Sequence, residues 1–259
     1  MMKARTKRFF ASLVTISVAV LFLVIGTAYG LIQPMLSIAI LTVGVSLLLL
    51  PKLTKRPLPS VLIPEFVPRQ KLAHSVGGFM IFGLGFFYGR SAAMVLISAC
   101  TATYIVYEAV RWIYFRESFY ITTVVYWLGS PEESMGRPYY SPIYAFLGLL
   151  TAYTLFSLEA ASVSAIVLSV GDGVAPVAGR FMGMMRNPLN QRKTVGGSLF
   201  GFLAAFAVCL IFARPLVAAC GCAVGMLVEC LPMRIDDNFS APVASALAAA
   251  IVGKILDIL

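Results

Sequence analysis

Nine apolar runs, each close to the length needed to cross a bilayer, dominate this sequence of 259 residues. A membrane-spanning helix needs about 20 mainly apolar residues. Only 12% of the chain is charged, against about a quarter in a typical soluble domain. We therefore expect an all-α, polytopic membrane protein with about nine transmembrane helices, forming one integral membrane domain over 1–259. The runs lie at 9–29, 31–50, 72–89, 91–110, 140–157, 160–178, 196–213, 215–231 and 240–257.

The basic residues predict the orientation of these helices, because Lys and Arg are retained on the cytoplasmic side. With a cytoplasmic N-terminus, 17 of the 20 Lys and Arg fall on the inner side, and Arg90, Arg214 and Lys254 fall on the outer side. The net charge of +9 is thus a topology signal and does not indicate nucleic-acid binding. We expect a multi-pass protein of the cell membrane or the endoplasmic reticulum membrane.

For several segments the sequence predicts structure but no catalytic or binding role. The N-terminal run resembles a signal peptide but has no convincing cleavage site, so we expect it to be retained as the first span. Segment 51–68 has five prolines and is expected to be an extended connection, and 111–130 is expected to be an interfacial or re-entrant element. The five cysteines lie in or beside apolar runs, where we expect neither a disulfide nor a metal site.

Asp172 is the first candidate for chemistry, because it lies inside an apolar run. An ionised carboxylate within a membrane is costly, so such an acid is a functional candidate by default. The structural alternative is an ion pair between helices. Gly171, Gly173 and Pro176 would loosen the helix nearby, and Arg180 follows Asp172 by about two turns.

A basic segment precedes a Gly-Gly-Ser sequence that begins the next apolar run. Backbone N–H groups at a glycine-rich helix N-terminus can bind an anion, and neighbouring cations can hold phosphate oxygens. The alternative is that these basic residues only set the topology. The residues predicted to bind phosphate are Arg192, Lys193, Thr194, Gly196, Gly197 and Ser198.

Acidic residues are concentrated near the end of the eighth run, at Glu229, Asp236 and Asp237. Together with Asp172, they could hold Mg²⁺ through carboxylate oxygens, with water and phosphate completing the shell. The alternative is a cap on the last helix, made by Asp237 or Asn238.

A fourth cluster, with Lys71 and the lone histidine His74, lies at the start of the third run. His74 is either packed or faces a phosphate. All four clusters fall on the inner side of the predicted topology. This predicts a site where a phosphorylated, water-soluble substrate meets a lipid, because phosphoryl transfer needs mainly positioning, cations and Mg²⁺.

Four motifs in 65–250 resemble the polyprenol kinase family, which includes dolichol kinase, phytol kinase and the CTP-dependent diacylglycerol kinase, and more distantly phosphatidate cytidylyltransferase. Gly171-Asp172, Ala175, Gly179-Arg180 and Gly183 resemble its G-D-x-x-A-x-x-x-G-R-x-x-G stretch. Residues 193–198 resemble K-[ST]-x-E-G-[ST], although Gly196 stands where the family often has an acid. Glu229, Asp237-Asn238 and Pro242 resemble its late E…D-N…P segment, and 69–75 resemble its early basic element.

The resemblance implies transfer of the γ-phosphate of CTP to a membrane lipid alcohol, such as diacylglycerol, a polyprenol or a similar isoprenoid alcohol, at the cytoplasmic face. It implies that Asp172 binds Mg²⁺ or activates the hydroxyl, and that Glu229 and Asp237 assist the metal or act as base. Arg180, Arg192 and Lys193 would hold phosphates.

Two other functions stay open from sequence. A CTP-dependent cytidylyltransferase acting on a lipid phosphate would release pyrophosphate in place of CDP. A transporter is the second alternative, although the chain has no repeated halves with broken helices at the midplane. The particular alcohol, the choice of CTP over ATP and the oligomeric state are not predicted.

Overall fold

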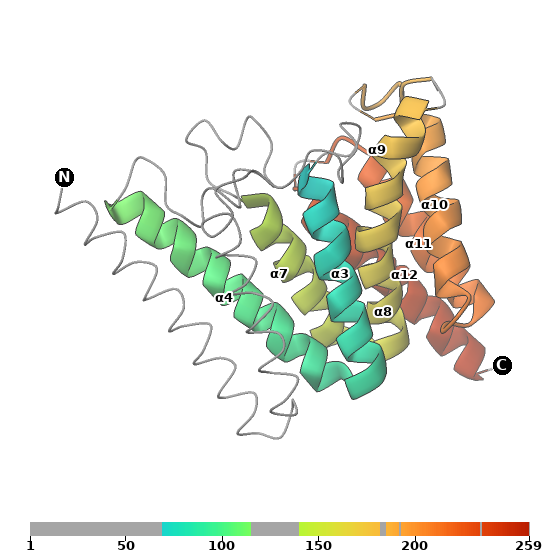
Figure 1. The fold of residues 1–259 in the computed structure, drawn as a ribbon. Coiled ribbons are helices and arrows are strands. Elements are labelled where there is room, and N and C mark those ends of the chain that lie inside the picture. Colours follow the sequence, from blue (N-terminus) through green and yellow to red (C-terminus); the bar gives the residue numbers. More distant parts are fainter. Residues whose placement is uncertain (1–68, 115–139, 182–184, 192, 234, 259) are drawn as a thin grey trace, which may run out of the picture. The chain divides into compact units, whose positions relative to one another are not determined.

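The computed structural model describes residues 69–114, 140–181, 185–191, 193–233 and 235–258, and within these ranges the chain is helical and contains no strand. The all-α prediction is therefore confirmed for this part of the chain (Figure 1). The helices are α3 (Arg69–Tyr88), α4 (Arg90–Tyr114), α7 (Tyr140–Leu155), α8 (Leu158–Ile166), η2 (Val167–Gly171), α9 (Asp172–Phe181), α10 (Val195–Cys209), α11 (Pro215–Cys230) and α12 (Asp237–Ile258).

Each of the last seven predicted apolar runs coincides with helix. The runs 9–29 and 31–50, the proline-rich segment 51–68, and residues 115–130 of the predicted interfacial or re-entrant element lie outside the described residues. The predicted nine spans and the cytoplasmic N-terminus therefore stay predictions. By length and composition, two described helices could cross a membrane: Leu158–Phe181, formed by α8, η2 and α9 without a break, and Asp237–Ile258.

The chain divides into two compact units. Residues 71–97 and 144–259 form one unit, and 1–70 with 98–143 form the other. The helices that carry the predicted site residues Asp172 to Asp237, which are α9 to α12, belong to the first of these units.

The continuous helix of α8, η2 and α9 lies at the centre of this unit and packs against α10, α11 and α12. Small residues allow the helices to approach closely. A Cβ atom built on Gly225 of α11 would lie 2.7 Å from Val167 Cγ1 and 2.9 Å from Ser245 Cβ. The buried apolar core comprises Ala160, Val163, Ile166, Val167, Ala175, Ala205, Cys209, Ala213, Val217, Ala218, Cys222, Met226 and Ala249.

Local sequence explains where these helices begin. Ser157 caps α8 by accepting a hydrogen bond from the N–H of Ala160, and Pro215 occupies the first turn of α11, where a missing N–H costs nothing. Gly89 joins α3 to α4 with a φ of +85°, a left-handed conformation that glycine adopts without steric cost.

An ion-pair cluster lies at one end of the unit. The guanidinium of Arg214 donates to Glu159 at 2.8 Å and to Asp257 at 2.6 Å, joining the first turns of α8 and α11 to the last turn of α12. These two carboxylates raise the pKa of Arg214, mainly through the hydrogen bond to Glu159. The candidate site lies at the other end of the same helices.

Candidate active site

A π-helical turn, η2, positions Asp172. Such turns are rare and are found frequently at functional sites. The Ser75 hydroxyl of α3 donates to the carbonyl oxygen of Ser169 in this turn at 2.6 Å. A Cβ atom on Gly173 would lie 2.4 Å from Ser75 Oγ, so only glycine allows this approach. The contact holds α3 against the turn that leads into Asp172, whose exposed fraction is 5%.

A short hairpin, described at 185–191 and 193–195, precedes α10 and carries Lys193. Its two sides are joined by backbone hydrogen bonds from Asn187 N to Lys193 O (2.8 Å) and from Val195 N to Met185 O (3.2 Å). The hairpin ends at Thr194, whose hydroxyl oxygen accepts from Gly197 N at 3.1 Å and caps α10. These bonds hold the backbone of Lys193 directly before the start of α10.

Lys193 forms ion pairs with two acids from other helices. Its Nζ lies 2.5 Å from Glu229 Oε1, at the end of α11, and also donates to Asp237 Oδ2, at the start of α12. Burial alone would lower the pKa of Lys193, but the attraction of both carboxylates raises it above the ordinary value. The ion pairs therefore favour the protonated, cationic form of Lys193.

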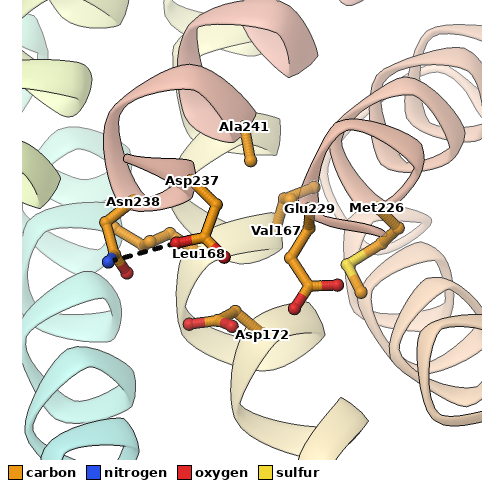
Figure 2. Close-up of a pocket in the computed structure, with 8 residues that line it drawn as sticks. All are labelled: Val167, Leu168, Asp172, Met226, Glu229, Asp237, Asn238 and Ala241. Carbon is orange, nitrogen blue, oxygen red and sulfur yellow. Dashed lines mark hydrogen bonds between the residues drawn. The ribbon is translucent and has the colours of Figure 1, made fainter. Parts of the chain in front are cut away.

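The acids surround a small pocket between η2, α9, α11 and α12. In Figure 2 the carboxylates of Asp172, Glu229 and Asp237 point toward a common space. The Oε2 atom of Glu229 also lies 3.5 Å from Ser198 Oγ, at the limit for a hydrogen bond. The pocket has an acidic side and an apolar side, and it is lined by Val167, Leu168, Asp172, Met226, Glu229, Asp237, Asn238 and Ala241.

The cap of α12 is made by Asp236, so the predicted capping role of Asp237 or Asn238 is wrong. Asp236 Oδ1 accepts from the backbone N–H of Asn238 at 3.0 Å and from its side-chain nitrogen at 2.7 Å. Because Asp236 accepts the hydrogen bond from the N–H group at the start of the helix, the carboxylate of Asp237 can pair with Lys193.

The structure brings together the most important residues of three predicted clusters: Asp172, Lys193, and the pair Glu229 and Asp237. Gly196, Gly197 and Ser198 are buried in the first turn of α10 beside them. Arg180 is exposed near the end of α9 and does not line the pocket. Arg192 lies outside the described residues, as do the side chains of Lys71 and His74, whose backbone belongs to the start of α3.

Within the described ranges, no group of three or more His, Cys, Asp or Glu side chains is arranged to hold a metal ion. Lys193 bridges Glu229 and Asp237 directly. Mg²⁺ in enzymes is commonly held by one or two carboxylates plus substrate phosphates. Asp172, Glu229 and Asp237 have the oxygen chemistry for a cation that binds together with phosphate, and their metal role stays a prediction.

Sequence reasoning did not find Asn187, which is buried and ties the hairpin to α11. Its side-chain nitrogen donates to the carbonyl oxygen of Cys230 at 2.9 Å, and its side-chain oxygen accepts from Leu189 N at 2.9 Å. The Asn-Pro pair at 187–188 is a turn signal that could have suggested the second bond. The first bond joins residues 43 positions apart, and no local pattern predicts it.

Comparison with known proteins identifies lipid-alcohol kinases. The chain is 32% identical over 139 residues to a probable phytol kinase 1, chloroplastic, of Oryza sativa subsp. japonica, covering 47% of this chain and 43% of that protein. It is 33% identical over 128 residues to farnesol kinase, chloroplastic, of Arabidopsis thaliana, covering 41% of each. A CTP-dependent diacylglycerol kinase 1 of Eremothecium gossypii is 32% identical over 74 residues, covering 29% of this chain and 23% of that protein.

No family model matches the sequence, and no solved structure matches it either. The chain spans less than half the length of the curated relatives it matches. Over the portion that they share, the chain is similar to phytol, farnesol and CTP-dependent diacylglycerol kinases, and the predicted resemblance to lipid-alcohol kinases is confirmed there.

Proposed function

We propose that this protein is a CTP-dependent kinase that phosphorylates a membrane lipid alcohol at the cytoplasmic face. The observation that carries the proposal is the meeting of Lys193 with Glu229 and Asp237, beside a pocket that Asp172 also lines. These residues come from four segments of the chain, and each belongs to a motif that resembles the kinase family. The names of the relatives support the same class of reaction.

Lys193 is the residue best placed to hold a phosphate. An ammonium group has three N–H donors. Two of them point to Glu229 and Asp237, which leaves the third for a phosphate oxygen of the nucleotide. Because both acids fix the direction of the side chain, little side-chain entropy remains to be lost when the nucleotide binds.

The charge of the pocket supports a divalent cation as cofactor. Asp172, Glu229 and Asp237 carry three negative charges when ionised, and Lys193 carries one positive charge. A nucleotide triphosphate would be repelled by the remaining negative charge unless a cation entered with it. One or two of these carboxylates, together with the phosphates of the nucleotide, would hold Mg²⁺, which would neutralise phosphate charge during transfer.

In the proposed reaction, the oxygen of the lipid alcohol forms a bond to the γ-phosphorus of CTP. The bond between that phosphorus and the oxygen bridging to the β-phosphate breaks, and CDP leaves. The hydroxyl proton passes to a carboxylate, for which Asp172 is the proposed acceptor because it is buried at the pocket. The apolar side of the pocket, formed by Val167, Leu168 and Met226, suits the carbon chain beside the hydroxyl.

The proposal is tested by incubating the purified full chain with radiolabelled CTP or ATP, Mg²⁺ and a panel of lipid alcohols that includes phytol, farnesol, a long polyprenol and diacylglycerol. We expect a labelled lipid phosphate and CDP, separated by thin-layer chromatography. A parallel reaction with a lipid phosphate, phosphatidic acid, tests the first alternative: release of pyrophosphate with a cytidylylated lipid there, and no phosphorylation of any alcohol, would show a cytidylyltransferase instead. Passage of a solute across proteoliposomes, without chemical conversion of any panel member, would favour a transporter.

A further inference from the structure

The side chain of Asn187 connects two elements of the site. It is 7% exposed and lies in the hairpin, six residues before Lys193 in the sequence. Its nitrogen donates to the carbonyl oxygen of Cys230, the last residue of α11. The last carbonyl groups of a helix have no partner within the helix, so this bond caps α11 with a side chain from the hairpin.

The backbone of Asn187 is bonded to Lys193. Asn187 N donates to Lys193 O at 2.8 Å, and Lys193 N donates to Asn190 O at 2.9 Å. The side-chain oxygen of Asn187 accepts from Leu189 N, and this bond fixes the turn that begins at Asn187. The main chain of Lys193 is therefore held relative to Asn187 by the hairpin itself.

These contacts form a closed ring. Lys193 is bonded to Asn187 through the backbone, Asn187 is bonded to Cys230 through its side chain, and Cys230 follows Glu229 in the sequence. Glu229 completes the ring by pairing with Lys193 Nζ at 2.5 Å. In such a ring, the bond between Asn187 and Cys230 limits how far Lys193 can move from Glu229.

We propose that Asn187 is a positioning residue that sets Lys193 against Glu229 through its hydrogen bond to the carbonyl of Cys230. Asn187 itself touches no substrate. Without this bond, the hairpin moves as a unit away from the end of α11, and Lys193 loses the geometry in which it faces a phosphate. The proposal rests on the proposed function only for its kinetic consequence, since the position of Lys193 can be measured without any substrate.

Two variants separate the bonds of Asn187. Asn187→Asp keeps an oxygen for Leu189 N but replaces the donor to Cys230 with a second oxygen. Asn187→Ser also offers an oxygen within the turn and is too short to reach Cys230, and it introduces no charge into a buried position. Gln191→Ala, at an exposed residue of the same hairpin, is the matched control.

The first measurement is the acylation rate of Lys193 in the purified full chain, with acetic anhydride as the probe and peptide mass spectrometry as the readout. Lys254, exposed near the end of α12, is the internal reference. We expect the rate of Lys193 relative to Lys254 to rise several-fold in both Asn187 variants and to stay unchanged in Gln191→Ala. The thermal midpoint in detergent identifies any variant that has lost its fold.

The second measurement is phosphorylation. Misplacing a reacting group by about 1 Å can cost a hundredfold in rate, so we expect kcat to fall by about ten- to a hundredfold in both variants, with a raised KM for the nucleotide. Unchanged labelling of Lys193 in folded Asp and Ser variants would overturn the proposal. Increased labelling in both variants, when the wild-type protein shows no kinase activity, would support the positioning role and reject the proposed function.

Discussion

Lys193 brings together residues that are far apart in the sequence: Glu229 is 36 positions away and Asp237 is 44 positions away. The sequence predicted all three as site residues, because acids cluster near Glu229 in a chain with only eleven of them, and because Lys193 precedes a Gly-Gly-Ser sequence within a motif that resembles the kinase family. It could not predict that Lys193 pairs with both acids, since ion pairing depends on the tertiary packing of α11 and α12. For the same reason it assigned Asp237 a possible capping role that Asp236 fills.

The raised pKa of Lys193 has a consequence for stability. The ion pairs of protonated Lys193 contribute their full stabilisation at pH values below its ordinary pKa of about 10.4. This contribution is lost only as the pH rises from there through the higher pKa of the folded state. Across the neutral range used for kinase assays, Lys193 therefore stays protonated. If kcat changes with pH in that range, the change has to come from the titration of another group.

Asp172→Asn is predicted to lower kcat by about 10²- to 10⁴-fold, because an amide cannot accept the hydroxyl proton of the alcohol. The measurement is steady-state phosphorylation of whichever panel alcohol is turned over. Asp257→Asn makes the same chemical change at an exposed acid of the opposite end and is expected to keep normal turnover. Full activity of a folded Asp172→Asn protein would remove Asp172 from the mechanism.

Lys193→Met is predicted to destabilise the fold by about 2 kcal/mol, because it leaves the buried carboxylate of Glu229 without its cation. Adding Glu229→Gln should recover part of this loss, since the uncompensated charge is then removed. Unfolding midpoints in detergent for both single variants and the double variant measure the coupling. Strictly additive effects would mean that the ion pair contributes nothing to stability.

At the scale of elements, the apolar runs predicted the positions of the described helices well, because the length and hydrophobicity of such a helix depend on its own local sequence. The π turn was not predicted, since it depends on how η2 packs against neighbouring helices. Gly171 of η2 and Gly201 of α10 approach so closely that a Cβ on Gly201 would lie 2.6 Å from the carbonyl oxygen of Gly171. The irregular turn and the glycines together bring Asp172 next to α10.

Gly197→Ala is predicted to destabilise the protein by about 1–3 kcal/mol and to reduce activity, because the new Cβ would lie 2.4 Å from the carbonyl oxygen of Ala175. A backbone atom cannot move aside without shifting α9 from α10. Gly83→Ala, in α3, meets no atom within 4 Å and should be neutral or slightly stabilising. Thermal unfolding and turnover of the two variants make the comparison, and equal effects would show that close packing of α9 and α10 is unimportant.

At the scale of the whole unit that contains the site, polar chemistry is divided between two ends. One end holds Lys193 with its acids, and the other holds Arg214 with Glu159 and Asp257. The sequence anticipated this division through the predicted placement of Arg214 on the outer side. It did not anticipate the partners of Arg214, which lie 55 and 43 residues away.

The predicted sidedness can be measured with single cysteines introduced at Gln191, in the hairpin, and at Ile258, which is 85% exposed at the end of α12. In sealed vesicles of known orientation, a membrane-impermeant maleimide should label Gln191→Cys from the cytoplasmic side only and Ile258→Cys from the opposite side only. Peptide mass spectrometry reads each position separately, so the native cysteines can remain. Labelling of both positions from one side would contradict a bundle that crosses the bilayer.

The ion pairs of Arg214 lie at the end of the helices away from the pocket. If the bundle crosses a bilayer and the protein is the proposed kinase, the nucleotide and its diphosphate product enter and leave through the same aqueous compartment. The lipid product gains a charged headgroup that is costly to move through hydrocarbon. Newly phosphorylated lipid would therefore accumulate in the monolayer adjoining the nucleotide supply, and a separate flippase would be needed to deliver it to the other monolayer.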